Sequence, residues 1–598
     1  MIDLSMLHAR WTVSATSIGI DSGTRVGSLG LRMQANTQAE DSVAVAPKDA
    51  KNGVPAGGPG AGRPRAPNPR VVNPPPSNAG FEVVLDGALA MLVCLVTIAM
   101  RAVWLQYPMI LGAEKAVIDQ AAALSDHVFD FNVHPPLARV LQAGMIRYMH
   151  FVAELAQVPS FDLQEANVIA LRAVNLGLGG FAAAALFLLA RLLGISRVCS
   201  LLAASFAVLD PMHAILSRTA LTREMLGTVL VQCSFLLLLW FLRGVRRDHL
   251  DDRSNKRVSK AGRIIRRLFL IACLAAVCAQ ALLTTWSGGS GIFLFVVIGF
   301  FGIWPFVYRP LPMYEIAFGK LVFATMYVIT YALFMSNTRC VPEEAVDTIR
   351  RQFSLQFRSG LVDCSAADDE AIAQKFGSVL DVHFPLNLDA LEWVTRGSYE
   401  YHDFLARNVS QRTALSGPRD VVWYSWILNL NNASIHTESV LSSKGDVESR
   451  VHGVFNPVMS ASVGFLGFVF VFTAVIVGRL RKSVDARILA PLVPRLSIGA
   501  VLCLGWLASM LPFFTVFKGG PAFEYFPALF FAQLLTALTV DLMGRPIHVV
   551  VSIMLMWMQV LCYGAYAPWI YALPLRRGLH QMLAIVPNWW SYIDNSGA

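Results

Sequence analysis

Charged residues are scarce in this chain. Asp, Glu, Lys and Arg make up only 15% of its 598 residues and hydrophobic residues make up 55%, whereas soluble domains carry about 25% charged residues. The mean hydropathy is +0.52. Because so little charge cannot cover the surface of a soluble chain of this length, the composition predicts a polytopic membrane protein.

Several signatures of other functions are also missing. The net charge is +9, yet no basic patch is interleaved with aromatic residues, which argues against a nucleic-acid partner. The nine cysteines lack the paired spacing of a zinc site, and no loop carries a cluster of acids at the spacing of divalent-metal ligands. The chain also lacks internal repeats and the matched, Gly/Pro-interrupted helices of a transporter. We therefore expect no nucleic acid, no metal and no organic cofactor.

The chain does contain a series of apolar runs long enough to cross a membrane as helices. A shorter apolar stretch, 137–157, contains Arg139, Arg147, His150 and Glu154, and this mixed character predicts a helix along the membrane interface. We predict an all-α polytopic membrane protein with eleven spans, at 83–105, 168–190, 198–216, 224–242, 265–284, 291–308, 317–336, 457–478, 494–516, 523–543 and 547–570.

The distribution of Lys and Arg predicts the orientation of these spans. The densest basic clusters lie between Arg243 and Arg267 and between Arg479 and Arg487, and short basic loops stay in the cytosol. This places the N-terminus in the cytosol. The loops 106–136 and 337–456 and the tail 571–598 then lie on the opposite side.

The first 80 residues differ from the rest, because they are rich in Pro, Gly, Ala, Asn and Ser. Such a segment buries too little apolar area to fold, so we predict a disordered cytosolic tail. It lacks the apolar core and cleavage site of a secretory signal peptide, so we expect the first span to direct membrane insertion.

The loop 337–456 carries two features of a secretory lumen. Asn408 and Asn432 each begin an Asn-x-Ser acceptor for N-glycosylation, which is used only on the lumenal side. Cys340 and Cys364 lie in the same loop, where an oxidising compartment permits a disulfide between them. Both features agree with the orientation that the basic clusters predict.

A polar loop follows the first apolar run. Its residues 130–137 read Asp-Phe-Asn-Val-His-Pro-Pro-Leu, and Glu114 lies twenty positions before His134. The two prolines fix their own φ and keep the preceding residue out of the helical region, so this part is extended and stiff. A proline pair alone also fits a helix-breaking turn between two spans. With the rest of the chain, the pattern predicts a catalytic loop beside the membrane.

Further landmarks follow in the order found in one known family. The chain resembles, from about Glu114 to Pro568, the protein O-mannosyltransferases, which are polytopic glycosyltransferases of the GT-C class. Each landmark alone is weak, whereas their shared order along an eleven-span plan is specific. The landmarks are 131–137, Leu171–Asn175, Leu209-Asp210, Ser217-Arg218, Tyr401–Leu405, Trp423–Trp426, Asn456-Pro457, Gly505-Trp506, Leu511–Phe514 and Tyr525–Leu529.

The resemblance implies a fold, a reaction and a place in the cell. The fold is the GT-C glycosyltransferase fold, with lumenal catalytic loops. The reaction is transfer of mannose, with inversion, from dolichyl phosphate mannose to Ser or Thr of secretory proteins at the endoplasmic reticulum membrane. The family commonly forms dimers, so a homodimer or a heterodimer with another member is implied. The loop 337–456 is too short for the β-trefoil MIR insert of eukaryotic members.

We divide the chain on this plan as follows. A disordered tail, 1–80, precedes a transmembrane catalytic module, 81–336, with spans one to seven and the catalytic loop 106–136. The lumenal loop 337–456, spans eight to eleven within 457–570, and a lumenal tail, 571–598, complete the chain.

Three acids of the family pattern are missing. Ala113 stands before Glu114 where the family has Asp, and Asn132 and Arg223 also replace Asp. A carboxylate lies within two residues of each, namely Glu114, Asp130 and Glu224, so the charge has either moved or been lost. Two alternatives therefore stay open: a family member without catalysis that serves as a partner subunit, and a GT-C enzyme that uses another acceptor.

The reaction needs a carboxylate to take the proton of the attacking hydroxyl and cations to neutralise the departing phosphate. The predicted base is Glu114, with Asp130 in reserve; a solvated loop charge is the alternative role. The predicted phosphate-binding residues are Arg172 and Arg218, followed by Lys518. Snorkelling anchors at the membrane surface are the alternative role for the two arginines. His134 either binds phosphate or acceptor, or stiffens its loop. Two roles remain open for a last group of residues, which either line the acceptor cleft or belong to an interfacial aromatic belt. They are Tyr401, His402, Asp403, Trp423 and Trp426.

Overall fold

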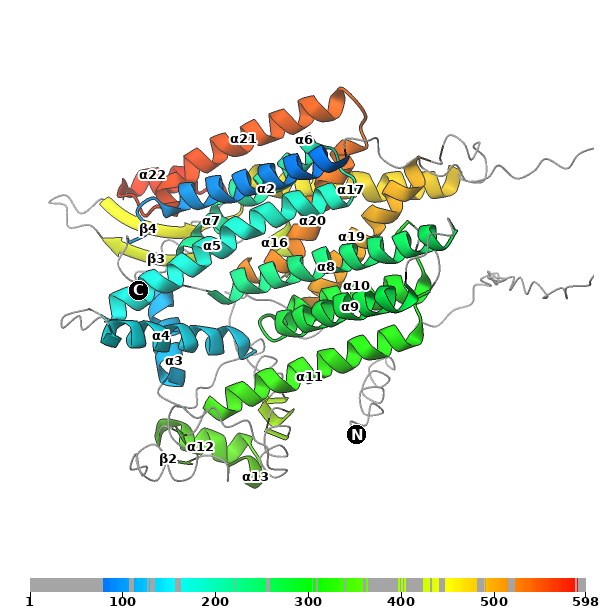
Figure 1. The fold of residues 1–598 in the computed structure, drawn as a ribbon. Helices are drawn as coiled ribbons and strands as arrows, with labels where there is room; N and C mark the ends of the chain where they lie inside the picture. The colour runs from blue at the N-terminus through cyan, green and yellow to red at the C-terminus, as the bar shows by residue number, and fades with distance from the viewer. Residues whose placement is uncertain are drawn as a thin grey trace, which may run out of the picture. The chain divides into compact units, whose positions relative to one another are not determined.

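Helices dominate the computed structural model, as the apolar runs predict (Figure 1). Nine helices of the described residues are long and apolar enough to cross a membrane. They are α2 (Ala79–Ala102), α5 (Leu163–Leu192), α8 (Thr222–Arg253), α9 (Lys260–Leu282), α11 (Met313–Asn337), α17 (Pro457–Leu480), α19 (Leu492–Pro512), α20 (Phe526–Asp541) with the preceding 3-10 turn η3 (Ala522–Tyr525), and α21 (Ile547–Ile570). The structure describes residues 79–106, 112–125, 128, 135–155, 163–220, 222–253, 259–303, 305–307, 310–337, 340–341, 343–358, 362–363, 396–397, 399–401, 403–404, 423–430, 433–439, 447–480, 489, 491–514, 522–586 and 589.

Two of the eleven predicted spans are helical but not simple crossings. The run 198–216 forms α6 (Arg197–Val208) and α7 (Pro211–Arg218), which are bent by 57°. The bend follows from Asp210, whose carboxylate accepts the His213 N–H and so begins a new helix, and from Pro211, which cannot continue the old one. The run 291–308 contains most of the short helix α10 (Ser290–Phe301), which follows the 3-10 turn η1 (Trp286–Gly289). This helix ends at Gly302 with φ +61°, a left-handed C-cap.

The long helices run side by side, from α21 and α2 on one flank to α11 on the other (Figure 1). The span that contains α20 lies at the centre, because 89% of it is buried, against 11% for that of α2 and 22% for α21. Close approach at this centre depends on Gly505 of α19, where a Cβ would lie 2.4 Å from the Phe531 ring. The outer helices instead expose large apolar side chains, among them Phe468 and Trp557, as a lipid-facing surface requires.

Two amphipathic helices follow the first span. They are α3 (Gly112–Ser125) and α4 (Leu137–Leu155), and α4 matches the predicted helix 137–157. Its Leu137 and Ile146 are buried, whereas Leu141 and Phe151 are exposed. The guanidinium of Arg147 donates to the Ser125 carbonyl at 2.8 Å and so caps the end of α3. Whether α4 lies along a membrane interface stays a prediction.

Small sheets, which the all-α prediction did not include, occupy the segments between and after the spans. In the first, β1 (Cys340–Val341) pairs in parallel with β2 (Val362–Asp363). In the second, β4 (Val447–Gly453) lies between antiparallel neighbours β3 (Ala433–Ser439) and β5 (Leu575–Arg576). The pairing of β4 with β5 places the segment before α17 beside the segment after α21. Short helices flank these strands: α12 (Glu343–Gln352), α13 (Leu355–Arg358), α16 (Trp423–Ile427) and α22 (Arg577–Leu583).

Candidate functional site

Glu114, in the first turn of α3, is buried against Arg172 of α5. The Arg172 Nε donates to Glu114 Oε1 at 2.9 Å, and Nη2 donates to Oε2 at 2.5 Å. The backbone N–H of Ala220 donates to Oε1 at 2.6 Å. The two side chains are 0% and 2% exposed, so this acid ties α3 to α5 and to the turn before α8. The sequence predicted that Glu114 lies in a loop beside the membrane, whereas the structure places it at the start of a helix and buries it in an ion pair.

Both arginines that the sequence assigns to the phosphate, Arg172 and Arg218, bind further protein groups. Arg172 Nη1 donates to the Leu105 carbonyl at 2.8 Å. Arg218 donates to the carbonyls of Arg101 at 2.6 Å and Trp104 at 3.2 Å, and its guanidinium carbon lies 4.6 Å from the centre of the Tyr571 ring. Arg218 therefore caps the C-terminal end of α2. A donor phosphate would have to compete with these contacts, and the phosphate-binding roles of Arg172 and Arg218 stay predictions.

Sequence reasoning missed a third buried arginine. Arg101 is 0% exposed at the end of α2. Its Nη1 contacts His213 Nδ1 at 2.9 Å and Ser217 Oγ at 3.0 Å, and its Nη2 donates to the Ala207 carbonyl at 2.5 Å. The sequence did contain a signal for Arg101, because an ionisable residue at the edge of an apolar run usually has a function.

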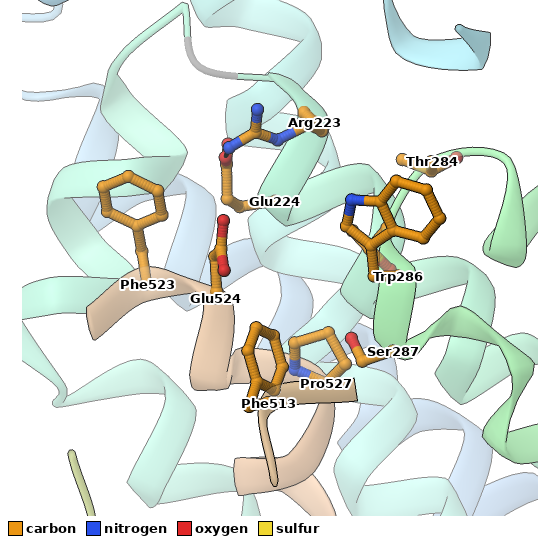
Figure 2. A pocket seen from close by; sticks show the side chains of 10 residues that line it. Arg223, Glu224, Thr284, Trp286, Ser287, Phe513, Phe523, Glu524 and Pro527 are labelled. Atoms are coloured by element: carbon orange, nitrogen blue, oxygen red, sulfur yellow. Dashed lines mark hydrogen bonds and ion pairs between the residues drawn. The ribbon is translucent and has the colours of Figure 1, made fainter. Parts of the chain in front are cut away.

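A pocket lies where four helical segments end, at their predicted lumenal ends (Figure 2). The start of α8 supplies Arg223 and Glu224, whose side chains form an ion pair. The cavity volume is about 20 Å³, which is room for about one water molecule and far less than a sugar ring. The remaining lining residues come from the turn after α9, the end of α19, η3 and α20, and are Thr284, Thr285, Trp286, Ser287, Phe513, Phe523, Glu524 and Pro527.

Glu524 is the unengaged carboxylate of this pocket. Figure 2 shows it pointing toward Glu224, and both Glu224 and Arg223 lie close enough to act on it electrostatically. Within the described part of the chain, the Glu524 carboxylate has no hydrogen-bond or ion-pair partner. Both oxygens of Glu114, in contrast, accept hydrogen bonds, and Glu224 is paired with Arg223.

Two contacts join motif residues to segments that lead into this pocket. The Leu137 N–H, at the end of the proline-rich motif, donates to the Leu283 carbonyl at 3.1 Å, next to the lining residue Thr284. The Ala220 N–H, which binds Glu114, lies four residues before Glu224. Leu137 and Glu114 therefore contact the chain just before two groups of lining residues.

Two of the predicted acceptor aromatics, Tyr401 and Trp426, are buried inside the protein. The Tyr401 hydroxyl accepts a hydrogen bond from Arg139 Nη2 at 2.7 Å. Trp426 packs edge-on against Phe513, with ring centres 5.0 Å apart, and so lies behind the pocket. Asp403 is half-buried. Their roles toward an acceptor stay predictions.

The remaining predictions fall outside what the structure describes. Side chains of Trp423 and Cys340 are not described, although their backbones belong to α16 and β1. Among the described residues, no group of three metal-ligating side chains surrounds the pocket; the one such group comprises Cys199, Asp541 and His548, away from the pocket. Predicted residues outside the described ranges are Asp130, His134, His402, Lys518, Asn408, Asn432 and Cys364, together with the tail before Ala79.

Comparisons with known proteins bear on the whole chain. Residues 91–336 match the family described as dolichyl-phosphate-mannose-protein mannosyltransferase, and residues 400–589 match the C-terminal four-transmembrane region of protein O-mannosyltransferase. These two matches cover well over half of the chain. No curated protein matches the sequence at a significant level.

Solved structures share the fold at low sequence identity. One chain of the S. cerevisiae protein O-mannosyltransferase Pmt1-Pmt2 complex bound to the sugar donor aligns with a TM-score of 0.64 and 12% identity, over 84% of this chain and 92% of that one. The oligosaccharyltransferase of Archaeoglobus fulgidus in the apo form aligns with a TM-score of 0.43 and 12% identity, over 86% of this chain and 60% of that one. The first alignment shows the GT-C fold.

Proposed function

Because the chain belongs to the dolichyl-phosphate-mannose-protein mannosyltransferase family of glycosyltransferases, we propose that it transfers mannose from dolichyl phosphate mannose to Ser or Thr hydroxyls of proteins. The observation that carries this proposal is the pair of family matches, which lie in the family's order on a multi-pass membrane protein. Agreement in fold with one chain of the yeast complex supports it.

The reacting centre, in this proposal, is the pocket lined by Arg223, Glu224 and Glu524. Three ionisable side chains meet there at the ends of membrane-length helices, and such groups are costly unless they serve a function. The contacts of Glu114 with Ala220 and of Leu137 with Leu283 connect these motif residues to segments that lead into the pocket. Because the cavity has room for about one water, binding of donor and acceptor must widen it.

Glu524 is the base that the described geometry favours. A base must accept a proton from the attacking hydroxyl, so its oxygens must be available. The Glu114 carboxylate is held by Arg172 and the Ala220 N–H, which suits an acid that positions other groups. We therefore propose Glu524 as the base in place of Glu114. An Asp130→Asn variant tests the reserve candidate.

Arg223 is the cation that we propose for the donor phosphate. It lines the pocket, whereas Arg172 and Arg218 donate to groups of the surrounding helices. A guanidinium offers two parallel donors to a phosphate and keeps its charge throughout the reaction. Its ion pair with Glu224 would hold the side chain at the pocket until the donor arrives.

The proposed setting is the endoplasmic reticulum membrane, with the pocket on the lumenal side. The basic clusters near Arg243 and Arg479 support this orientation. N-linked glycans at Asn408 and Asn432, removed by an endoglycosidase in intact microsomes only after permeabilisation, would agree with it. The chain that aligns with this protein comes from a Pmt1-Pmt2 complex, so we propose a dimer with a family member.

Mannose transfer by the purified full-length chain in lipid tests the function. The assay supplies dolichyl phosphate mannose and a Ser/Thr-rich peptide, with a polyprenyl lipid acceptor run in parallel. Transfer to the peptide alone is the expected result. Transfer only to the lipid acceptor would favour another GT-C enzyme. Donor binding without transfer, with activity restored by an added family member, would identify a subunit that has lost catalysis.

A further inference from the structure

A second buried polar cluster lies at the other end of α20 from the pocket. Cys199 lies in the first turn of α6, Asp541 is the last residue of α20, and His548 is the second residue of α21. Each contributes one ligand-type atom, and these three atoms lie within 4.8 Å of one another. The residues are 0%, 5% and 5% exposed. Because α20 has 16 residues, it separates this cluster from the pocket by roughly 24 Å.

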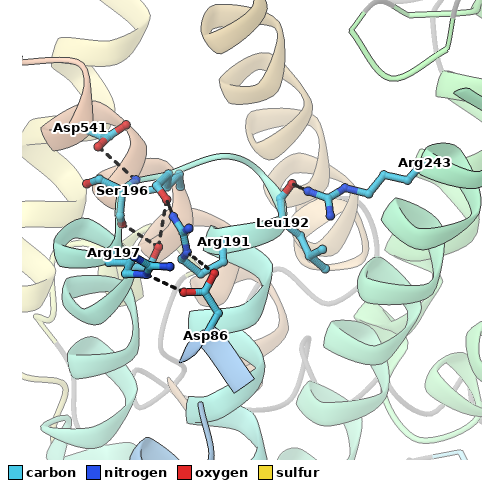
Figure 3. Close-up of polar contacts among 9 residues, drawn as sticks. Asp86, Arg191, Leu192, Ser196, Arg197, Arg243 and Asp541 are labelled. Atoms are coloured by element: carbon cyan, nitrogen blue, oxygen red, sulfur yellow. Dashed lines mark hydrogen bonds and ion pairs between the residues drawn. The ribbon is translucent and has the colours of Figure 1, made fainter. Parts of the chain in front are cut away.

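The surroundings hold Asp541 in position. Its Oδ1 accepts the Ser196 N–H at 3.2 Å, as Figure 3 shows, and its Oδ2 is paired with Arg495 Nη1 at 3.1 Å. The Cys199 Sγ lies 3.5 Å from Ser552 Oγ. The Asp541 carboxylate is thus fixed by a backbone N–H and an arginine. Metal ligands are commonly held in this way, because hydrogen bonds from neighbouring groups orient each ligand toward the ion.

One polar atom of the cluster has no partner. Within the described residues, the buried His548 Nδ1 makes no hydrogen bond. Buried polar side-chain atoms are nearly always hydrogen-bonded, so this exception needs an explanation. A cation among Cys199, Asp541 and His548 would give the imidazole a partner.

We propose that Cys199, Asp541 and His548 bind a structural zinc ion. Thiolate, imidazole and carboxylate are the three side-chain ligands that zinc uses, whereas calcium and magnesium prefer oxygen alone. Tetrahedral zinc with these bond lengths sets its ligand atoms about 3.3–3.6 Å apart, and the three atoms already lie within 4.8 Å of one another, so a small movement of the side chains brings them to this spacing. The Cys199 thiol releases its proton to solvent on binding, and water fills the fourth position.

The zinc ion would fasten three helices at one point. Because α6, α20 and α21 each contribute one ligand, the ion links segments that are 342 residues apart between Cys199 and Asp541. The site lies away from the pocket, so its expected effect is on stability. Cysteine spacing gave no hint of it, because the cluster has a single cysteine and its ligands come from distant segments.

Metal content of the full-length chain, purified without chelator and equilibrated with zinc, is the first test. The parent is expected to hold one zinc ion per chain by elemental analysis, and Cys199→Ala and His548→Ala to hold at least tenfold less. Cys278→Ala is the matched control, because Cys278 is equally buried but lies outside the cluster. Equal zinc in the parent and in Cys199→Ala would overturn the proposal.

Cobalt substitution of the parent gives a second readout that survives misfolding of a variant. Thiolate-bound cobalt produces a charge-transfer absorption band, so the parent should show this band and Cys278→Ala should retain it. Removal of the metal by a chelator should lower the thermal midpoint of the parent without changing that of a folded Cys199→Ala protein. A parent that shows neither bound zinc nor a thiolate–cobalt band would contradict the proposal.

Discussion

The two ends of the helix bundle differ in how deeply their arginines are buried. At the pocket end, Arg101 and the pair Glu114–Arg172 are almost fully buried. At the other end, Asp86 bridges Arg191 and Arg197, whose side chains are 21% and 33% exposed (Figure 3). A buried charge must be fully bonded or it destabilises the fold, whereas a half-exposed pair contributes little. The fully buried arginines, which destabilise the fold unless they are bonded, therefore lie at the same end as the pocket that we propose as the reacting centre.

The largest expected effect follows from breaking the buried pair. Glu114→Ala leaves Arg172 buried without its carboxylate, which should cost about 3–5 kcal/mol of stability. The thermal midpoint of the purified protein in lipid measures this loss. Glu114→Leu combined with Arg172→Met removes both charges and should recover much of it. A Glu114→Ala protein as stable as the parent would mean that the pair does not hold α3 against α5.

A pH effect should appear in the sheet region, where two histidines are buried. Burial lowers the pKa of His452 to about 3, with help from Arg450 and His580, and burial also lowers the pKa of His580. The unfolded chain therefore takes up protons first as the pH falls below about 6.5, so stability declines from there toward about pH 3. The slope approaches about 1.4 kcal/mol per pH unit for His452, and His580 adds to the decline in the same direction.

His452→Leu tests this effect directly. It removes a buried ring whose Nε2 has no hydrogen-bond partner among the described residues, so it should fold. Thermal midpoints measured at pH 7.5 and pH 5.0 should differ less in this variant than in the parent. An identical pH dependence in both proteins would show that His452 does not titrate on unfolding.

The smallest effect is expected at the half-exposed end. Asp86→Ala removes the acid shared by Arg191 and Arg197, and exposed pairs of this kind contribute about 0–1 kcal/mol. The thermal midpoint should therefore change much less than in Glu114→Ala. A loss as large as that of Glu114→Ala would erase the difference between the two ends.

The sequence predicted the helices better than it predicted the contacts between them. Each of the eleven apolar runs contains a helix, and nine of them match helices of membrane length, because run length encodes such a helix. The bend at Pro211 and the short η1–α10 segment depend on local caps, which the run lengths do not contain. Strand β5 was missed because two residues carry no periodicity, and it forms only where β4 offers a partner.

The candidate site was predictable by residue type but not by pairing. Glu114 and Arg172 were both singled out, yet nothing in their spacing says that they bind each other. Glu524 was passed over, because its availability appears only when α8, α9, α19 and η3 meet around it. The cluster of Cys199, Asp541 and His548 was hidden for the same reason.

The most direct test of the central claim compares Glu524→Gln with Glu114→Gln in the mannose-transfer assay, with thermal midpoints measured on the same preparations. Asp119→Asn, an exposed acid on α3, is the control. We predict that Glu524→Gln keeps the parent's midpoint and donor binding but loses about 10²–10⁴-fold in kcat, whereas Glu114→Gln lowers the midpoint. Parent-like kcat in Glu524→Gln would contradict the account and, if Asp130→Asn were inactive, would move the base to Asp130.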